Sequence, residues 1–493
     1  MLICNLASSA GFGKFNSLKF LLNISGQSGA RIMNGLKRLN YFFKARSVAV
    51  IGASKEPGKI GREILYSLLS SGYKGKVYPI NPKYEEIAGL KCYKSITEVP
   101  DFIDLAVLAI PAHLAPKIVE ECGRKGVKAI VIVSGGFKEV GGLGEELEKK
   151  VSEIARRYNI RVIGPNCIGV FDGRTRIDTF FQNYQRMIRP PPGTVAFLTQ
   201  SGTYGCTVLE WMAEEGIGIS KFVSYGNMVD VDEAELLEYL WMDPETKIIA
   251  FYIESLKSGR RFIEVARRVI RDKPVIVLKA GRTAYGAKAA KSHTGGLAGD
   301  YMIIRGALKQ AKVIMVDTLV ELYDTIKAFY MSPLPKGDKI AMITNGAGPC
   351  VMAADEIEEL GLQLATYSED TIDYLKRSLP PYAQIGNPLD LTGSATTRDF
   401  MISGKALAKD PKIDILAFFF VFQDTPLEDK IVDELPKLKA YNKPIFVMAA
   451  GGPYAKKQSK ILTSKGIPVY ESPERLVKAI YNLITYVRYS KGS

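Results

Sequence analysis

The segment Ser47-Val48-Ala49-Val50-Ile51-Gly52 decides the fold class, because a short, β-branched apolar run ends directly in a glycine. Runs of the same kind follow, each after sequence typical of one helix, at residues 76–81, 105–111, 129–134 and 161–164. Strands that are apolar throughout are typical of a parallel sheet with helices on both faces. These runs therefore predict an α/β domain.

The same alternation of strands and helices continues beyond two linkers, at residues 190–193 and 332–337, which are rich in proline. The series after each linker opens with a strand, a turn of small residues and a helix, so we expect two further α/β domains of related fold. The predicted boundaries are an N-terminal extension at residues 1–40 and three domains at residues 41–172, 173–334 and 335–493.

The composition is that of a globular protein, with 47% hydrophobic and 24% charged residues. No apolar run reaches the roughly 18 residues that a membrane span needs, so we expect no membrane association. Six cysteines are scattered without a CxxC pair, which argues against a zinc site or a disulfide framework and fits a reducing cytoplasm. We expect a cytoplasmic protein that ligates no metal itself.

The net charge of +14 suits anionic substrates such as phosphates and coenzyme A (CoA), although a lysine-rich surface would give the same value. No basic cluster is interleaved with aromatic residues, so we expect no binding of nucleic acid. Residues 1–40 carry basic residues and no acidic ones, which is typical of a targeting peptide. We favour an upstream extension with Met33 as the true start, because Met33 lies just ahead of the first folded segment.

One of only two histidines, His293, lies in the peptide Lys291-Ser292-His293-Thr294-Gly295-Gly296, directly after a predicted strand. Glycines let backbone N–H groups approach an anion closely, and imidazole can carry a phosphoryl group. A loop histidine that caps a helix is the alternative. His113 follows another strand end, where a loop or capping role is expected rather than contact with CoA.

Two strand-to-helix turns flank this histidine in sequence: Ser201-Gly202-Thr203 and Asn345-Gly346-Ala347-Gly348. The N-terminus of a helix favours anions, so each turn is a candidate phosphate site. Glu254 ends the strand predicted at residues 248–253, and adjacent parallel strands would place it beside the segment that carries His293. There its carboxylate could hold one imidazole nitrogen protonated. The alternative is a surface glutamate beside Ser255.

The first domain does not match a dinucleotide-binding fingerprint. Its turn from Gly52 to Gly61 is longer than GxGxxG, and Asn81-Pro82-Lys83 stands where such a domain has an acidic residue. This pattern argues against an NAD-dependent dehydrogenase and suits a phosphate or an adenine nucleotide.

Together these segments resemble the α subunit of NDP-forming acyl-CoA synthetases, which are relatives of succinyl-CoA synthetase. The resemblance covers about residues 41–490, and it is carried by the motifs Val50-Ile51-Gly52-Ala53-Ser54, Gly164-Pro165-Asn166-Cys167-Ile168-Gly169, Thr199 to Gly205, Ser292-His293-Thr294-Gly295-Gly296, Asn345-Gly346-Ala347-Gly348 and Gly386-Asn387-Pro388-Leu389-Asp390-Leu391. It implies a Rossmann-like CoA-binding domain followed by two flavodoxin-like ligase domains.

The resemblance also implies roles for single residues. His293 would be transiently phosphorylated with support from Glu254, and the two helix-opening turns would hold the phosphohistidine. Asn387 and Asp390 would face a partner or phosphate. CoA would lie near Gly52, Ala53, Ser54, Lys55, Asn81, Pro82, Lys83, Pro111, Ser134 and Asn166.

The nucleotide of this family binds an ATP-grasp domain, for which this chain has no room after residue 337. The resemblance therefore implies a separate ATP-grasp β subunit, usually in a heterotetramer, that holds ADP or ATP with Mg²⁺. The reaction implied is acyl-CoA + ADP + phosphate ⇌ carboxylic acid + ATP + CoA. A non-catalytic, CoA-binding regulatory relative of the same fold is the alternative, and acetate, branched-chain and aryl acids all stay open as substrates.

Overall fold

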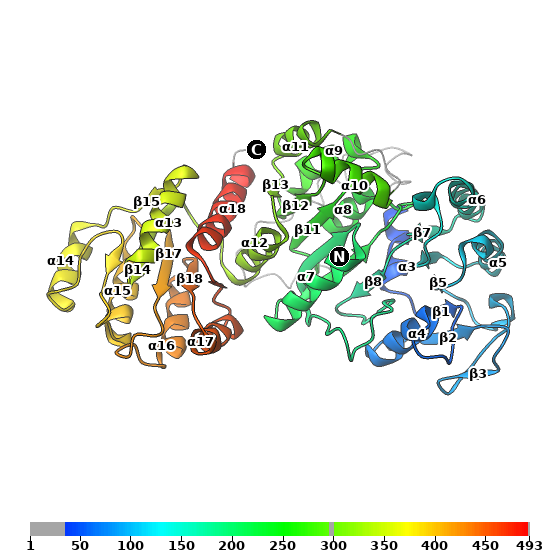
Figure 1. Ribbon diagram of the computed structural model, residues 1–493, viewed down its shortest axis with the longest axis horizontal. Coiled ribbons are helices and arrows are strands. Elements are labelled where there is room, and N and C mark those ends of the chain that lie inside the picture. The colour runs from blue at the N-terminus through cyan, green and yellow to red at the C-terminus, as the bar shows by residue number, and fades with distance from the viewer. Residues whose placement is uncertain (1–34, 295–299, 492–493) are drawn as a thin grey trace, which may run out of the picture.

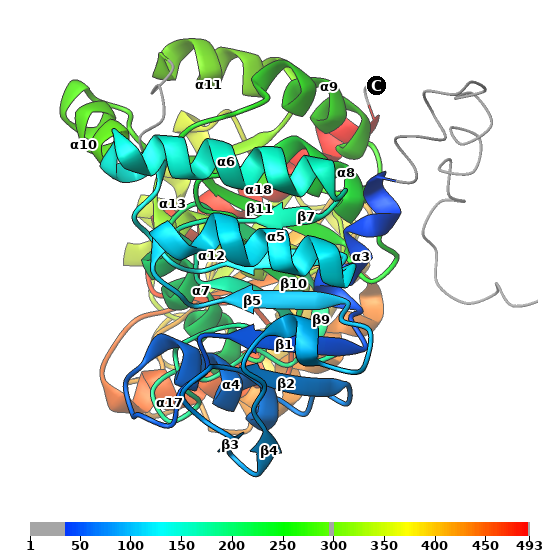
Figure 2. The ribbon, with the colours of Figure 1, turned by 90° about the vertical axis from the view of Figure 1, so that its right-hand side faces the viewer.

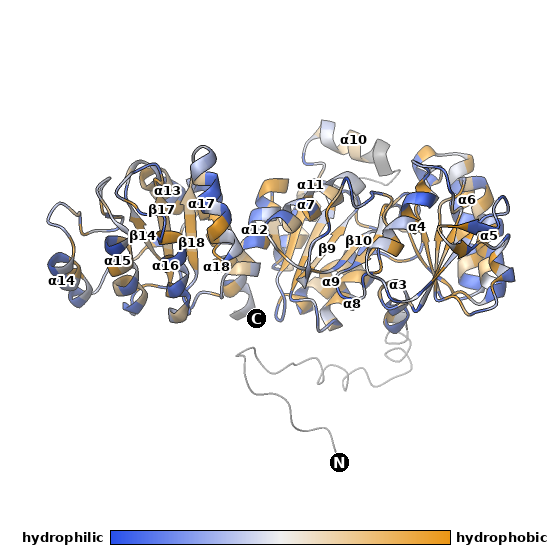
Figure 3. Cartoon of the chain, turned by 90° about the horizontal axis from the view of Figure 1, so that it is seen from below, coloured by the Kyte–Doolittle hydropathy of each residue, from blue (hydrophilic) through white to orange (hydrophobic). Residues whose placement is uncertain are grey.

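The computed structural model describes residues 35–294 and 300–491. Three α/β units lie side by side along the long axis of the molecule (Figure 1). Figure 3 shows the apolar strands enclosed by helices whose outer faces are hydrophilic. No helix in these two ranges is both long enough and apolar enough to cross a bilayer.

The first unit has a five-stranded parallel sheet in the order β2 (Lys76–Ile80), β1 (Ser47–Ile51), β5 (Leu105–Leu108), β6 (Ala129–Ile132) and β7 (Arg161–Ile163). Alternate residues of β1 face opposite sides, and both sides are buried. Val48 and Val50 share a core with helix α4 (Ile60–Ser70), whereas Ala49 and Ile51 pack with α5 (Ala115–Lys125) and α6 (Leu143–Arg157) (Figure 2). Burial on both faces explains why these strands are apolar throughout.

The second unit has six strands in the order β13 (Ile314–Val316), β12 (Val275–Lys279), β11 (Ile248–Ile253), β9 (Pro192–Thr199), β10 (Ile219–Ser224) and β8 (Gly169–Asp172). All are parallel except β8, which pairs antiparallel with β10. The predicted boundary after residue 172 therefore follows a strand that hydrogen-bonds to the sheet of the second unit.

The third unit repeats the order of the five parallel strands of the second. Its strands are β19 (Val469–Tyr470), β18 (Ile445–Ala449), β17 (Ile415–Phe420), β14 (Lys339–Thr344) and β15 (Gln363–Leu364), with the short β16 (Leu389–Asp390) also beside β14. When β8 and β16 are left out, the five remaining strands of each sheet, numbered in chain order, have the arrangement 2-1-3-4-5. Ligands of such sheets bind at the carboxyl ends of strands, where the strand order reverses.

The folded part of the chain begins before residue 41. Leu36 and Leu39 are buried, and Phe43 in helix α3 (Asn40–Phe43) stacks on Tyr239 of the second unit with ring centroids 5.5 Å apart. Two residues near the end of the predicted extension, Leu36 and Leu39, thus contribute to the core. Residues 1–34, with Met33, lie outside the described residues.

Candidate active site

The residues predicted to contact CoA lie at the carboxyl edge of the first sheet, each within four residues of the end of a strand. The Asn81 side chain donates to the carbonyl of Ala53 at 2.7 Å, which joins the segments after β2 and β1. The Asn166 N–H donates to the carbonyl of Ser134 at 2.9 Å, which joins the segments after β7 and β6. Pro111 precedes a short 3-10 helix (Ala112–Leu114) that contains His113.

Two glycines let helix α4 begin directly against the turn that follows β1. Gly52 has φ +90°, and a Cβ there would lie 2.3 Å from the carbonyl oxygen of Ala109. A Cβ on Gly61 would lie 2.0 Å from the oxygen of Gly52. The longer glycine spacing therefore still gives the close approach of helix and turn that phosphate binding uses.

The chemistry of this edge fits CoA. Lys55 and Lys83 are exposed, and neither forms an ion pair with another described residue. Lys55 lies over the ring of Tyr84 at 5.8 Å, and the Ser54 hydroxyl accepts from the N–H of Glu56 at 3.0 Å. Two ammonium groups without an ion-pair partner in the described part of the chain, beside a glycine turn, can meet the phosphates of CoA.

Helix α7 (Gly202–Glu214) of the second unit begins at the predicted turn. The Thr199 hydroxyl accepts from the Ser201 N–H at 3.0 Å and donates to the Ser201 carbonyl at 2.8 Å, and the Ser201 side chain caps the helix by accepting from Tyr204 N–H at 3.4 Å. The N–H groups of Gly202 and Thr203 have no hydrogen-bond partner among the described residues. This first turn can therefore bind an anion.

Helix α13 (Gly348–Glu359) repeats this arrangement in the third unit. The Thr344 hydroxyl accepts from the Gly346 N–H at 2.9 Å and donates to the Gly346 carbonyl at 2.8 Å. Ala347 precedes the helix without a side-chain cap, and proline occupies its first turn. The two predicted anion sites thus share one local geometry at equivalent places in two sheets.

Gln200, which the sequence analysis did not single out, ties the first of these turns to the strand that carries Glu254. Its Oε1 accepts from the N–H groups of Glu254 and Ser255, the latter at 2.8 Å, and its Nε2 donates to the Ser255 hydroxyl at 3.2 Å. Asn345 does the same in the third unit by accepting from Val421 N–H at 2.9 Å. Alignment of the two repeats would have identified Gln200, because Asn345 was already a candidate.

Glu254 is a buried carboxylate with only 6% of its surface exposed, so the alternative of a surface glutamate is wrong. It accepts from the Tyr252 hydroxyl at 3.3 Å. The predicted adjacency of strands is present, since β11 pairs with β12 and Ile253 lies opposite Lys279. Burial lowers the pKa of the Lys279 ammonium, and the nearby charge of Glu254 offsets part of that effect. Glu254 therefore lies in a site where charge is little screened.

His293 lies in a helix where the sequence analysis expected a loop. Helix α10 spans Ala284–Thr294, and His293 is in its last turn. Four alanines at positions 284, 287, 289 and 290 favour a helix here. The side chain of His293 and the following residues 295–299, including Gly295 and Gly296, lie outside the described residues.

The CoA edge of the first unit and the α7 turn of the second lie against each other. A Cβ on Gly202 would approach the side chain of Ile168 to 2.7 Å, and the Ile168 N–H donates to the Ser224 hydroxyl at 3.2 Å. Ile168 follows Asn166 by two residues. The arrangement can therefore bring a ligand on the first sheet to the anion site of the second.

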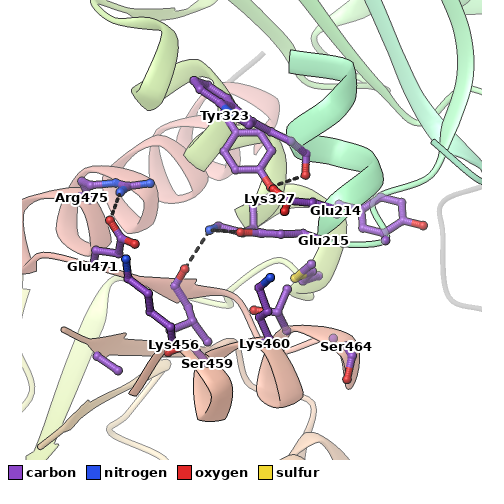
Figure 4. A pocket seen from close by; sticks show the side chains of 18 of the residues that line it. Glu214, Glu215, Tyr323, Lys327, Lys456, Ser459, Lys460, Ser464, Glu471 and Arg475 are labelled. Atoms are coloured by element: carbon purple, nitrogen blue, oxygen red, sulfur yellow. Dashed lines mark hydrogen bonds and ion pairs between the residues drawn. The ribbon is translucent and has the colours of Figure 1, made fainter. Parts of the chain in front are cut away.

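A cavity of about 1240 Å³ lies at the other end of α7, between the second and third units (Figure 4). Glu214, the last residue of α7, and Glu215, which follows it, line this cavity, and Lys456 and Lys460 line it from helix α17 (Pro453–Ser464). The 13 residues of α7 separate it from Ser201 by roughly 20 Å at 1.5 Å per residue. This cavity is thus distinct from the candidate site. Within the described ranges, no group of three His, Cys, Asp or Glu side chains is arranged to hold a metal ion.

Comparisons with known proteins agree with this arrangement. Residues 46–172 match the family described as CoA binding domain, residues 192–329 the succinyl-CoA ligase like flavodoxin domain, and residues 340–490 the ligase-CoA domain. The fold and site thus define a CoA-binding ligase of the succinyl-CoA synthetase type.

Individual relatives narrow the class. The chain is 42% identical to the α subunit of ADP-forming acetate–CoA ligase II of Pyrococcus furiosus, over 90% of this chain and 97% of that one. It is 44% identical to an ADP-forming acetate–CoA ligase of Methanocaldococcus jannaschii, over 91% of this chain and 63% of the relative. A solved acetyl-CoA synthetase of Ca. Korarchaeum cryptofilum, in complex with phosphate and ADP, superposes with TM-score 0.86 at 39% identity, covering 93% of this chain and 98% of that one. The chain belongs to the family of ADP-forming acetate–CoA ligases.

Proposed function

We propose that this chain is the α subunit of an ADP-forming acyl-CoA synthetase and that His293 carries the phosphoryl group. The observation that supports this most is the contact of the CoA edge, through Ile168, with the N-terminal turn of α7. An acyl-CoA held at the first edge would meet a phosphate at the second. A purely CoA-binding regulator would need no such pairing.

The proposed reaction has three steps. Phosphate attacks the thioester carbonyl, the C–S bond breaks, and acyl phosphate and CoA form. An imidazole nitrogen of His293 then attacks phosphorus, so the carboxylic acid leaves with the electrons of the P–O bond. Finally the phosphoryl group passes from His293 to ADP. Glu254 would hold the other imidazole nitrogen protonated, which frees the first as the nucleophile.

The N-terminal turns of α7 and α13 would stabilise the charge of the phosphorylated histidine. Each helix terminus contributes about 1 kcal/mol in a partly buried setting. Gly202 in one turn and Gly346 and Gly348 in the other let the backbone come close to the anion, because glycine adds no side chain there. Thr203 adds the N–H group of the next residue in the α7 turn.

The nucleotide is proposed to bind a second chain with an ATP-grasp fold, in a heterotetramer. The matched relatives named as α subunits support this, because the chain covers 97% and 98% of them, whereas it covers 63% of the single-chain relative of M. jannaschii. Mg²⁺ would accompany the nucleotide on that partner. A cytoplasmic location stays a prediction that rests on cysteine usage.

Radioactive phosphate tests the proposal. The chain, co-purified with its partner, is incubated with acetyl-CoA and labelled phosphate, and acid-labile, base-stable label on the chain is measured. Label is expected on the wild type and absent from His293→Ala, while His113→Ala keeps it. Label on His293→Ala would overturn the assignment. CoA binding without label on any chain would favour the regulatory alternative.

A further inference from the structure

Two carboxylates and one amide meet at the seam between the first and second units. Asn227, in the connection after β10, donates from the same Nδ2 to Glu139 Oε2 at 2.6 Å and to Glu148 Oε2 at 2.9 Å. Glu139 lies in a short 3-10 helix (Lys138–Val140), and Glu148 lies in α6. Asn227 and Glu148 are buried, with 3% and 9% of their surfaces exposed. We call these three residues the Asn227 cluster.

The two carboxylates of the cluster also hold the segment that follows β6. Glu139 Oε1 accepts from the N–H groups of Gly136 at 2.5 Å and Phe137 at 3.1 Å. Glu148 Oε2 accepts from the Lys138 N–H at 3.2 Å. The backbone from residue 136 to 138 is therefore fixed by the same acids that contact Asn227. This segment begins just after Ser134, at the proposed CoA edge.

Asn227 also contacts the other segment of that edge. Its N–H donates to the Pro165 carbonyl at 2.9 Å, and its Oδ1 accepts from the Asn166 side chain at 3.5 Å. Its neighbour Gly226 has φ +52°, and a Cβ there would lie 2.1 Å from the Pro165 oxygen. One residue of the second unit thus contacts both segments, 134–140 and 164–168.

Placing two carboxylates on one amide donor lowers the stability of the folded protein, because the two negative charges repel each other. Burial alone would raise the pKa of Glu139. Hydrogen bonds from Asn227 and from the backbone outweigh this effect and keep that pKa below its ordinary value. Burial raises the pKa of Glu148 in spite of its hydrogen bonds. Carboxylates whose environments push their pKa values apart are typical of functional sites.

We propose that the Asn227 cluster is a positioning device that fixes both CoA-binding segments against the second unit. It would hold the acyl end of CoA in register with the N-terminal turn of α7. The proposal rests on the proposed function. Asn227, Glu139 and Glu148 act through the backbone they hold, so they are positioning residues. Their loss is expected to weaken acyl-CoA binding more than it slows the chemical steps.

A reciprocal exchange of groups tests this. Asn227→Asp removes the donor and adds a third carboxylate, so KM for acetyl-CoA is expected to rise at least tenfold while kcat falls less than threefold. Adding Glu139→Gln to that variant restores the contact between positions 139 and 227 with donor and acceptor exchanged. The new amide group at position 139 donates to the new carboxylate at position 227, while its oxygen still accepts from the N–H groups of Gly136 and Phe137. The double variant is expected to recover KM to within threefold of the wild type. A change in packing alone would not be repaired by this second substitution.

A matched control is Asn482→Asp at the seam of the second and third units. Asn482 is also buried and donates to Glu321 Oε1 at 3.5 Å and Thr325 Oγ1 at 2.9 Å. Its substitution should lower the melting temperature and leave KM unchanged. If Asn227→Asp does not fold, the single variant Glu139→Gln tests the proposal instead, and its KM for acetyl-CoA is expected to rise at least threefold.

The outcomes are read on the complex with its partner, and CoA binding to the same preparations is measured by calorimetry. An unchanged KM, or a double variant no better than Asn227→Asp, would overturn the inference. A wild-type complex that binds no CoA would instead overturn the proposed function. The two failures are therefore distinguishable.

Discussion

Glu254 combines burial with a fixed backbone, which are the two conditions for a carboxylate that orients an imidazole. Gln200 holds its N–H, and Tyr252 donates to its side chain. Burial first, and then the charge of Glu254, raise the pKa of Tyr252, so that hydroxyl stays a donor at neutral pH. Hydrogen bonds therefore hold both the backbone and the side chain of Glu254 in place.

Glu254→Gln should lower kcat by about 100-fold, within the range for loss of a positioned acid or base, and leave CoA affinity within twofold of the wild type. The amide keeps the shape of the side chain and removes its charge. Steady-state kinetics and calorimetry with CoA check this. Glu321→Gln on helix α12 (Leu319–Met331) is the control and should change neither value. Lost CoA binding in Glu254→Gln would mean that this residue serves the first unit.

Lys273 gives a prediction about stability and pH. It is 6% exposed, its ammonium donates to the carbonyls of Leu240 at 2.8 Å and Asp243 at 2.7 Å, and burial lowers its pKa to about 8. Below pH 8 both the folded and unfolded chains carry the charge, and the folded chain bears its full desolvation cost. From pH 8 to about 10.5 the unfolded chain binds more protons, so the folded state gains stability as pH rises.

Lys273→Met removes this dependence. Relative to the variant, the wild type should gain about 3 kcal/mol in free energy of unfolding between pH 7 and pH 10.5, from a shift of about 2.5 pKa units. Urea unfolding of both chains at several pH values measures the difference. Tyrosine ionisation affects both chains and cancels. If the difference in free energy of unfolding between the two chains does not change with pH, the pKa of Lys273 is not lowered in the folded state.

At the scale of elements, turns and helix ends place the site, and glycine contacts set how closely they approach. Gly61→Ala should cost about 1–3 kcal/mol and raise the Kd for CoA at least tenfold, because the new methyl group would meet the oxygen of Gly52 and push α4 from the turn. Chemical unfolding and calorimetry check both effects. Gly306 in helix α11 (Tyr301–Gln310) has open space around it, so Gly306→Ala should instead stabilise by about 0.5–1 kcal/mol. Equal effects of the two substitutions would contradict this view.

The sequence predicted those elements whose apolar pattern reports local burial. Strands β1 and β11 follow their predicted runs, and so do the turns at Ser201 and Asn345. Helix α10 was missed because the motif around His293 was interpreted from its glycines, which lie beyond the helix. The membership of β8 in the second sheet was missed because strand pairing depends on long-range geometry that no local pattern encodes.

The site was predictable where one residue type carries the chemistry, and less so where side chains only orient others. Glu254 could be found because a carboxylate directly follows a strand. Glu139, Glu148 and Asn227 come from three elements of two units, and only the fold brings them together. Gln200 lies between these two cases, because it only orients other groups but could have been found from Asn345, its equivalent in the third unit.

At the scale of the whole molecule, the third unit is held to the second by helices α12 and α18 (Pro473–Lys491), which lie side by side between the two sheets (Figure 1). Arg475 binds Asp324 through both carboxylate oxygens, at 2.7 Å and 2.8 Å, and Asp324 is 2% exposed. Lys327 donates to the Val469 carbonyl at 2.8 Å across the same seam. The α13 turn is carried by this third unit, so its position relative to α7 depends on these contacts.

Arg475→Met should therefore uncouple the third unit from the second. The Asp324 side chain is buried, whereas that of Arg475 is partly exposed, so removing the arginine is expected to cost about 1–3 kcal/mol, because the Asp324 carboxylate stays desolvated without this partner. Calorimetric melting is expected to split into two transitions, with the third unit melting first, and turnover should fall while CoA affinity stays unchanged. Arg488→Met is the matched control on the same helix. Its pair with Asp338 at 2.7 Å is partly exposed, so its loss should cost at most about 1 kcal/mol. A single transition in Arg475→Met, or equal effects in both variants, would mean that apolar packing of α12 on α18 alone sets the position of the third unit.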